Sequence, residues 1–142
     1  MIYFTSELPT FKVKNVRKLK KWLSEVAQRE HFSIDELTYI FLDDEALLEM
    51  NVSYLNHDTL TDIITFDNSE PETPYIEGDI FISIERVKEN ATLFNVPFEQ
   101  ELRRVLSHGL LHLCGYKDKT KEEEKLMRQK EEEALQLFEE LL

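Results

Sequence analysis

The segment that most constrains this chain is a short apolar helix that carries two histidines and ends at a glycine. It reads HGLLHLCGYKD over residues 108–118. Four helical residues turn about 400°, so His108 and His112 are expected about 40° apart around the helix axis and about 6 Å apart along it. Gly115 suits a left-handed backbone conformation that ends the helix, so the chain should turn back there. Asp118, ten residues after His108, then stands at the third-ligand position of H-x-x-x-H-x-x-G-x-x-(H or D) metal sites.

Two imidazoles at this spacing can bind one metal ion, and a carboxylate is an acceptable third zinc ligand beside them. We therefore predict one divalent ion per chain, expected to be zinc, bound by His108, His112 and Asp118. The alternative is a pair of histidines buried in an apolar core. Cys114 is the only cysteine, which excludes an internal disulfide and a Cys-based zinc cage, and it should face away from His112 into the core. Gly109 stands where H-E-x-x-H proteases have their general base, so that group is missing.

Apolar periodicity and turn residues predict one α+β domain over residues 1–142, a small mixed sheet of about four strands covered by about five helices. Strands are expected at 1–4, 37–42, 62–66 and 78–84, helices at 15–30, after 43, at 85–94, 97–113 and 120–141, and a loop at 68–75. Asp43 is a suitable N-cap for the second helix, and Pro97 suits the first turn of the fourth. Thr120 and Glu123 fit a capping box on the last helix. The predicted metal site lies on a helix of the C-terminal half.

The charge of the chain is strongly negative and unevenly distributed. The net charge is −12, which argues against broad, non-specific nucleic-acid binding. The N-terminal part nevertheless gathers six cations, namely Lys12, Lys14, Arg17, Lys18, Lys20 and Lys21. Eight glutamates gather in residues 122–140. Both clusters could be solvated helix faces, or the first could be a functional basic patch.

The apolar runs of the chain are short. None approaches the roughly 18 residues that a membrane span needs, so we expect no membrane partner. The N-terminal residues lack the layout of a secretory signal, so a cytoplasmic location is expected.

The histidine segment and two further blocks resemble the YbeY family of metal-dependent single-strand endoribonucleases, which are linked to ribosomal RNA maturation. The family signature H-G-x-L-H-L-x-G-Y-D-H is matched at His108, Gly109, Leu111, His112, Leu113, Gly115 and Tyr116. The family block N-x-x-Y-R-x-x-D-x-P-T-D-V-L-S-F resembles residues 51–66, and G-D-I-x-I-S is present at 78–83. The blocks stand in family order and cover nearly the whole chain. The resemblance implies RNA phosphodiester hydrolysis on single-stranded RNA, expected to be rRNA, and binding to ribosomal particles.

Two positions depart from the family pattern. Asp118 replaces the family's third histidine ligand, which keeps a ligand and adds a negative charge. Leu55 replaces an arginine that the resemblance assigns to RNA phosphate contact or transition-state stabilisation. His57 is a candidate substitute because a protonated imidazole can meet a phosphate, and the simpler alternative is an ordinary loop histidine. Asp62 either caps a turn or lines a cleft, and Asp79 either orients a ligand histidine or satisfies loop amides.

Three functional hypotheses follow. The first is a zinc-dependent endoribonuclease in rRNA maturation, with His57 and Asp62 as candidate catalytic residues and the basic N-terminal helix supplying phosphate contacts. The second is a non-catalytic ribosome-maturation factor whose metal only locks the helix to the following loop, which the loss of the family arginine favours. The third is a zinc-dependent hydrolase of another bond, such as a peptide, which the missing glutamate after His108 disfavours.

Overall fold

A computed structural model describes residues 1–55 and 61–141 of the chain. These residues form nine elements: β1 (Ile2–Ser6), α1 (Val16–Arg29), β2 (Ser33–Leu42), α2 (Asp44–Leu55), β3 (Ile63–Asp67), β4 (Tyr75–Ser83), α3 (Ile84–Leu93), α4 (Phe98–Leu113) and α5 (Lys121–Glu140). The α+β class predicted from the sequence is therefore confirmed, with four strands and five helices in the described part of the chain. In those same residues, no helix combines the length and apolar character that crossing a membrane requires.

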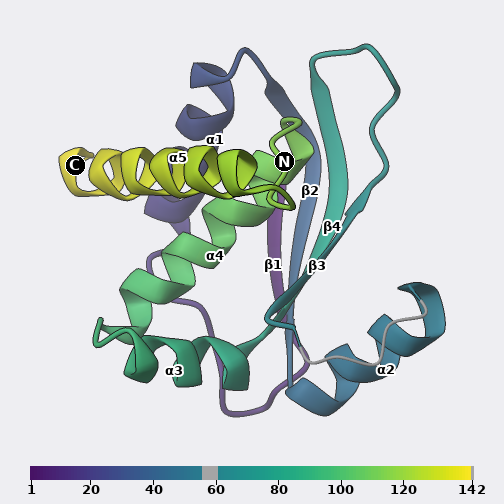
Figure 1. Ribbon diagram of the computed structural model, residues 1–142, viewed down its shortest axis with the longest axis vertical. Coiled ribbons are helices and arrows are strands. Elements are labelled where there is room, and N and C mark those ends of the chain that lie inside the picture. Colours follow the sequence, from purple (N-terminus) through teal and green to yellow (C-terminus); the bar gives the residue numbers. More distant parts are fainter. Residues whose placement is uncertain (56–60, 142) are drawn as a thin grey trace.

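The four strands form one mixed sheet in the order β1-β2-β4-β3. β2 lies parallel to both β1 and β4, whereas β3 runs antiparallel to β4. In this register Tyr39 of β2 stands between Phe4 of β1 and Ile80 of β4, and Ile80 in turn faces Thr65 of β3. The strands β1 and β3 are thus the two edges of the sheet (Figure 1).

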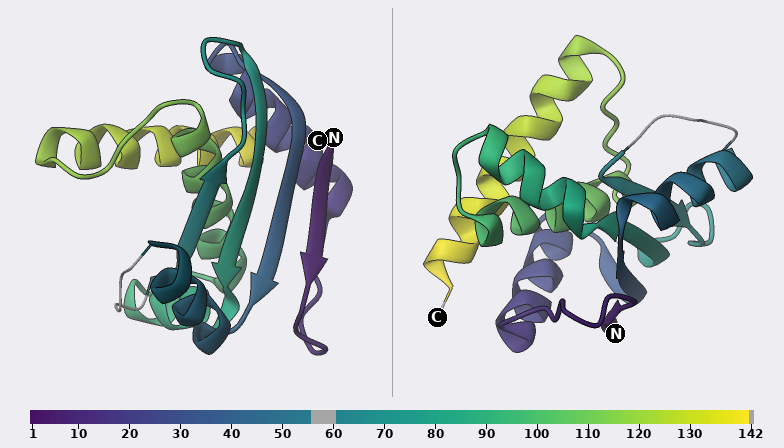
Figure 2. Two further views of the ribbon diagram at one scale, coloured as in Figure 1. Left: turned by 90° about the vertical axis from the view of Figure 1, so that its right-hand side faces the viewer. Right: turned by 90° about the horizontal axis from the view of Figure 1, so that it is seen from below.

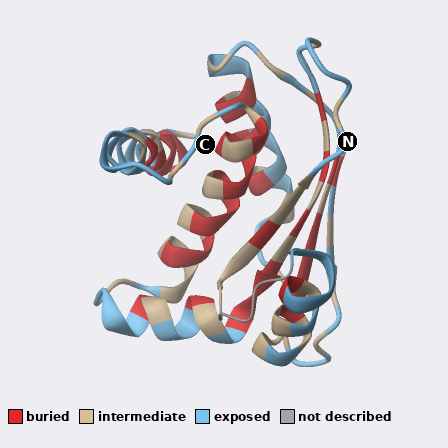
Figure 3. Ribbon diagram, turned by 45° about the vertical axis from the view of Figure 1, so that its right-hand side comes forward, coloured by how far each residue is buried: buried red, intermediate tan, exposed pale blue. Residues whose placement is uncertain are grey.

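Helices cover both faces of the sheet, but unequally. The main core joins alternate residues of the strands, among them Tyr39 and Ile80, to buried side chains of α1, α3, α4 and α5. A smaller cluster on the opposite face joins Ile40 and Ile64 to Leu47 of α2. The N-terminal end of α2 is joined to α3 by the ion pair between Asp44 and Arg86, and Figure 2 shows the two helices next to each other. Figure 3 shows buried residues along the strands and along α4. The strands therefore carry apolar residues on both faces, as sheets covered on both sides do.

Several helix ends follow the predicted capping chemistry. The Asp43 carboxylate accepts a hydrogen bond from the backbone N–H of Ala46 at 2.8 Å, and Thr120 and Glu123 form the complete capping box on α5. Pro97 is a correction: it is the N-cap of α4, with an extended backbone (φ −61°, ψ 147°), rather than a residue of the first turn. A proline has no N–H to donate, so it is also tolerated one position before the helix.

Two strands begin earlier than the sequence predicts. β2 starts at Ser33 rather than Leu37, and β4 starts at Tyr75, inside the expected loop, rather than at Gly78. The added residues pair with one another along the β2–β4 ladder, with an irregularity between Ile34 and Glu36. Ile34 and Ile76 pair with each other and pack in or against the main core, whereas Ser33, Asp35 and Glu36 are polar and exposed. One apolar residue at each strand start is too short a signal to predict a strand, whereas backbone pairing requires none. β4 also ends at Ser83, and Ile84 begins α3 instead of ending the strand.

Candidate metal centre

The helix α4 holds its two histidines on the side that faces away from its buried leucines. Its apolar face is fully buried in the main core, and Gly109 lies directly against the sheet. A Cβ added at Gly109 would meet Ile80 Cδ1 at 2.8 Å and Ile63 Cδ1 at 3.0 Å. This close approach explains the glycine after His108: a glutamate there would point into the core rather than toward a metal.

The turn after α4 brings Asp118 back to the histidines. Gly115 has φ 102°, and the hydrogen bonds from Gly115 N–H to the His112 carbonyl and from Tyr116 N–H to the Leu111 carbonyl form a Schellman motif. The same turn places the Tyr116 carbonyl oxygen 2.9 Å from His112 Nδ1. The helix end and the site are therefore built by one backbone feature.

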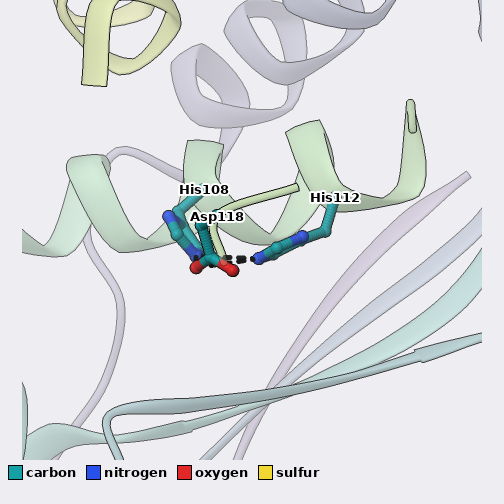
Figure 4. A group of neighbouring side chains, drawn as sticks. All are labelled: His108, His112 and Asp118. Carbon is teal, nitrogen blue, oxygen red and sulfur yellow. Dashed lines mark hydrogen bonds and ion pairs between the residues drawn. The ribbon is translucent and has the colours of Figure 1, made fainter. Parts of the chain in front are cut away.

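Three ligand atoms converge at this point, as Figure 4 shows. His108 Nε2 lies 3.0 Å from His112 Nε2, and Asp118 Oδ2 lies 3.3 Å and 3.4 Å from these two nitrogens. A tetrahedral zinc site with metal–ligand bonds of about 2.0–2.1 Å has ligand atoms about 3.3 Å apart. Within residues 1–55 and 61–141, this is the one group of three His, Cys, Asp or Glu side chains whose ligand atoms lie within 4.8 Å of one another.

The hydrogen bond at Nδ1 of each imidazole determines whether Nε2 is free to bind a metal. His108 Nδ1 lies 2.6 Å from Glu131 Oε2, and His112 Nδ1 lies 2.9 Å from the Tyr116 carbonyl, so in each ring Nδ1 is the atom placed to donate its proton. In neutral imidazoles the two Nε2 lone pairs then point at each other and at the Asp118 carboxylate. Three hydrogen-bond acceptors with no hydrogen-bond donor among them need a cation between them. The two nitrogens and one oxygen fit a divalent metal with one coordination position left open.

Glu131 of α5 contacts His108 and is the residue of this site that the sequence did not lead us to expect. Its side chain is only 7% exposed, and its second oxygen, Oε1, accepts a hydrogen bond from Arg104 Nη1 at 3.2 Å. Burial lowers the pKa of His108, but the Glu131 hydrogen bond, with the charges of Asp118 and Asp62, raises it above its ordinary value overall. One glutamate of the acidic cluster is thus buried at the site rather than on a solvated helix face.

A signal for Glu131 was nevertheless present in the sequence. It interrupts an apolar stripe at helical spacing, which consists of Met127, Ala134, Leu135 and Phe138. A carboxylate at such a buried position needs a partner. Asp79, the other carboxylate considered for this role, instead accepts a hydrogen bond from the side-chain amide of Asn68 at 3.1 Å.

The three ligand residues line a cleft of about 920 Å³ that runs along α4. Its other walls come from the ends of α2 and α3, from β3, and from the middle of α5. Asp62 lies in this cleft, so the cleft-lining alternative holds for it. Burial raises the pKa of its carboxyl group, and the nearby His108 only partly offsets the shift.

The chain is similar to known proteins over almost its whole length. The family model described as Endoribonuclease YbeY matches residues 4–139. The chain belongs to the YbeY family. Proteins named Endoribonuclease YbeY from Flavobacterium psychrophilum and Cytophaga hutchinsonii are 54% and 53% identical to it, over 97% and 96% of this chain and 96% and 94% of theirs. The solution structure of TM1509 from Thermotoga maritima is 28% identical, with a TM-score of 0.66 over 97% of this chain and 89% of that one.

The two departures from the YbeY signature take different positions in the structure. Asp118 is one of the three converging ligand residues. Leu55, at the end of α2, lines the cleft with 44% of its surface exposed, where the family pattern has an arginine. His57 lies outside the described residues.

The basic N-terminal helix does not border the YbeY-type cleft, which corrects the expectation that it would guide RNA there. Among the described residues, none of those lining the cleft comes from α1, and its cations are Arg104, Lys119 and Arg128. The reason is topological: α1 follows β1 at one edge of the sheet, whereas the cleft lies beside β3 at the other. Arg104 is already paired with Glu101, Glu131 and Glu132.

Cys114 is not part of the metal group. It is partly buried beside the main core, as the helical spacing predicts. Burial, with a smaller contribution from the Glu30 charge, raises the pKa of its thiol to about 12. The thiol therefore stays protonated at neutral pH, and a protonated thiol is a poor metal ligand.

Proposed function

We propose that this protein is a zinc-dependent, single-strand-specific endoribonuclease that acts in rRNA maturation in the cytoplasm. The observation that carries the proposal is the convergence of two imidazole nitrogens and one carboxylate oxygen within 3.0–3.4 Å of one another, on the wall of an open cleft. The name Endoribonuclease YbeY, which the relatives carry, supports RNA as the substrate. The N₂O donor set supports zinc.

Each residue of the site has a separate task in this proposal. His108, His112 and Asp118 would hold the ion, which when bound lowers the pKa of a water molecule and polarises a phosphoryl oxygen. Glu131 and the Tyr116 carbonyl fix the two imidazoles with Nε2 toward the ion. Asp62 takes the proton of the attacking water, because the raised pKa of its carboxyl group lies nearer to neutral pH than that of an ordinary aspartate. His57 remains our prediction for a phosphate contact.

The cleft suits a flexible strand better than a rigid duplex. Its rim carries exposed apolar side chains, Phe94 at the end of α3 and Leu55 at the end of α2, which would contact unstacked bases. Aromatic and apolar contacts accept any base, so the proposal includes no sequence preference from these two residues.

A second candidate function is a non-catalytic maturation factor that binds ribosomal particles. The observation that favours it is Leu55, which cannot bind a phosphate at the position where the family pattern has a cation. A peptide hydrolase is disfavoured, because Gly109 packs against the sheet and leaves no place for the glutamate base of that class.

Cleavage of a labelled single-stranded RNA tests the proposal. We expect cleavage that a chelator removes, that added zinc restores, and that His112→Ala abolishes while circular dichroism shows an intact fold. Parent and His112→Ala proteins purified in parallel control for contaminating ribonucleases, which do not depend on this ligand. Equal cleavage by both preparations, or binding to ribosomal particles without cleavage under any metal, would favour the non-catalytic factor instead.

A further inference from the structure

A second charged surface lies far from the metal cleft. The 17 residues from Leu8 to Ser24 contain six cations and no acidic residue, in a chain whose net charge is −12. Five of these cations are exposed, and we call them the basic face: Lys12, Lys14, Arg17, Lys20 and Lys21. The sixth, Lys18, is half-buried with its ammonium 4.1 Å from the centre of the Phe138 ring.

The fold keeps the basic face free of neutralising partners. Leu19, Trp22, Leu23 and Val26 bury the opposite side of α1 against α4, α5 and β2, so the cations are left facing solvent. Within the described part of the chain, none of the five lies within 4.0 Å of a carboxylate. Cations of the neighbouring helices behave differently, since Arg103 and Arg104 of α4 and Lys130 of α5 are all paired with glutamates. Unpaired cations retain their full attraction for an anionic partner.

A groove runs beside the basic face. It has a volume of about 450 Å³ and is lined by residues Tyr3–Ser6 of β1, by Lys12, Val13, Val16 and Lys20, and by Phe41. β1 is an edge strand, so its outer side carries no further strand in the described structure. Tyr3, with 41% of its surface exposed, offers an aromatic side chain next to the lysines. Cations beside an aromatic, partly apolar groove are the combination that binds a sugar–phosphate chain with an unstacked base.

The groove and the metal cleft lie at opposite edges of the sheet. One is lined by β1 and the other by β3, and three inter-strand spacings separate these strands, which amounts to about 14 Å. The cleft itself is lined by more acids than bases, namely Asp62, Asp67, Glu101, Asp118 and Glu131 against Arg104, Lys119 and Arg128. With a divalent ion bound, these charges only balance, so the cleft offers an RNA strand no net positive charge. Attraction has to come from another part of the surface.

We propose that the basic face and its groove bind the sugar–phosphate backbone of the RNA substrate outside the cleavage site. This inference rests on the proposed function, because it takes RNA as the substrate. An acidic protein is negatively charged like RNA and could also bind the basic face, but protein interfaces are built around a buried apolar centre. Of the side chains that form the basic face and line its groove, Tyr3 is the one large apolar residue that is exposed. RNA, whose affinity comes chiefly from phosphate contacts, fits this surface better.

The test compares two RNAs and two triple variants of the full chain. The first variant is Lys14→Gln/Lys20→Gln/Lys21→Gln, and the matched control Lys88→Gln/Lys121→Gln/Lys125→Gln removes three exposed, unpaired lysines elsewhere. The probes are a short single-stranded oligonucleotide that fits the cleft alone and a longer RNA that carries a duplex stem beside the same single strand. Fluorescence anisotropy of the metal-free protein across salt concentrations measures binding, and gel assays of the zinc-loaded protein measure cleavage.

We expect the first variant to bind the longer RNA at least about tenfold more weakly near 0.1 M salt. The slope of log K against log salt should shrink by about 2 to 3, because each lost phosphate contact removes about 0.7–0.9. The control should bind like the parent, and both variants should cleave the short oligonucleotide at the parent rate.

The outcomes separate this proposal from the proposed function. A parent that binds the longer RNA through these lysines but cuts nothing would overturn the endoribonuclease function and leave the RNA-binding face standing. Unchanged binding by the first variant, or an equal loss in the control, would overturn the RNA-binding face while leaving cleavage untouched. Tighter binding of poly-glutamate than of RNA at the same salt would also overturn it, in favour of an acidic protein partner.

Discussion

Replacing Glu131 by glutamine should weaken zinc binding without unfolding the protein. The Glu131 carboxylate accepts the Nδ1 proton of His108 at 2.6 Å and so holds the ring with Nε2 toward Asp118 and His112. A glutamine keeps the size of the side chain but loses the charge that makes His108 a stronger ligand. Removing such a partner typically costs 10–100-fold in metal affinity, which corresponds to about 1.4–2.7 kcal/mol.

Glu132→Gln is the matched control for this prediction. Glu132 also binds Arg104, with its Oε1 2.9 Å from Nη2, but its side chain is 58% exposed and contacts neither histidine. Competition with a chromophoric zinc chelator at pH 7.5 gives Kd for parent, Glu131→Gln and Glu132→Gln, and urea unfolding of the metal-free proteins checks stability. Zinc affinity within twofold of the parent for Glu131→Gln, or an equal loss for Glu132→Gln, would refute the claim that Glu131 orients His108.

Substitutions at four further residues test other parts of the site and fold. Asp118→Ala should weaken zinc binding strongly in the same competition assay, whereas Asp118→His should preserve it; alanine behaving like the parent would exclude Asp118 as a ligand. Leu55→Arg should raise cleavage of single-stranded RNA at unchanged zinc content, and no gain in an active parent would show that another group serves the phosphate. Burial raises the pKa of the Glu101 carboxyl above 4.5, so ionising it costs the folded state stability as pH rises through that range. Glu101→Gln should therefore raise the free energy of unfolding more at pH 7 than at pH 4 in urea titrations, and a gain of the same size at both pH values would contradict this origin. Gly109→Ala should destabilise the fold by about 1–3 kcal/mol, because its Cβ would lie 2.8 Å from Ile80 Cδ1; an unchanged urea midpoint would show that the sheet can yield there.

Local sequence determined the features of this protein that depend on neighbours within a few residues. The four-residue spacing of His108 and His112, the glycine at 115 and the carboxylate at 118 predict a shared ligand position, because helix geometry and one left-handed residue relate them directly. The caps at Asp43 and Thr120 were predictable for the same reason, since capping joins side chains to backbone groups two or three positions away. The α+β class followed from the apolar periods of the separate segments.

Tertiary structure alone decided which distant segments meet. Glu131 reaches His108 across 23 positions only because α5 packs on α4. The apolar stripe around Glu131 indicates that this carboxylate turns inward, but no local pattern indicates that its partner is a histidine of α4. The starts of β2 and β4 became strands through backbone pairing with each other, which a single apolar residue in each, Ile34 and Ile76, is too little to predict. Strand order likewise placed the basic face at the β1 edge and the metal cleft beside β3. The order of residues reveals a cluster of cations, but only the strand order of the sheet determines how far this cluster lies from the metal cleft.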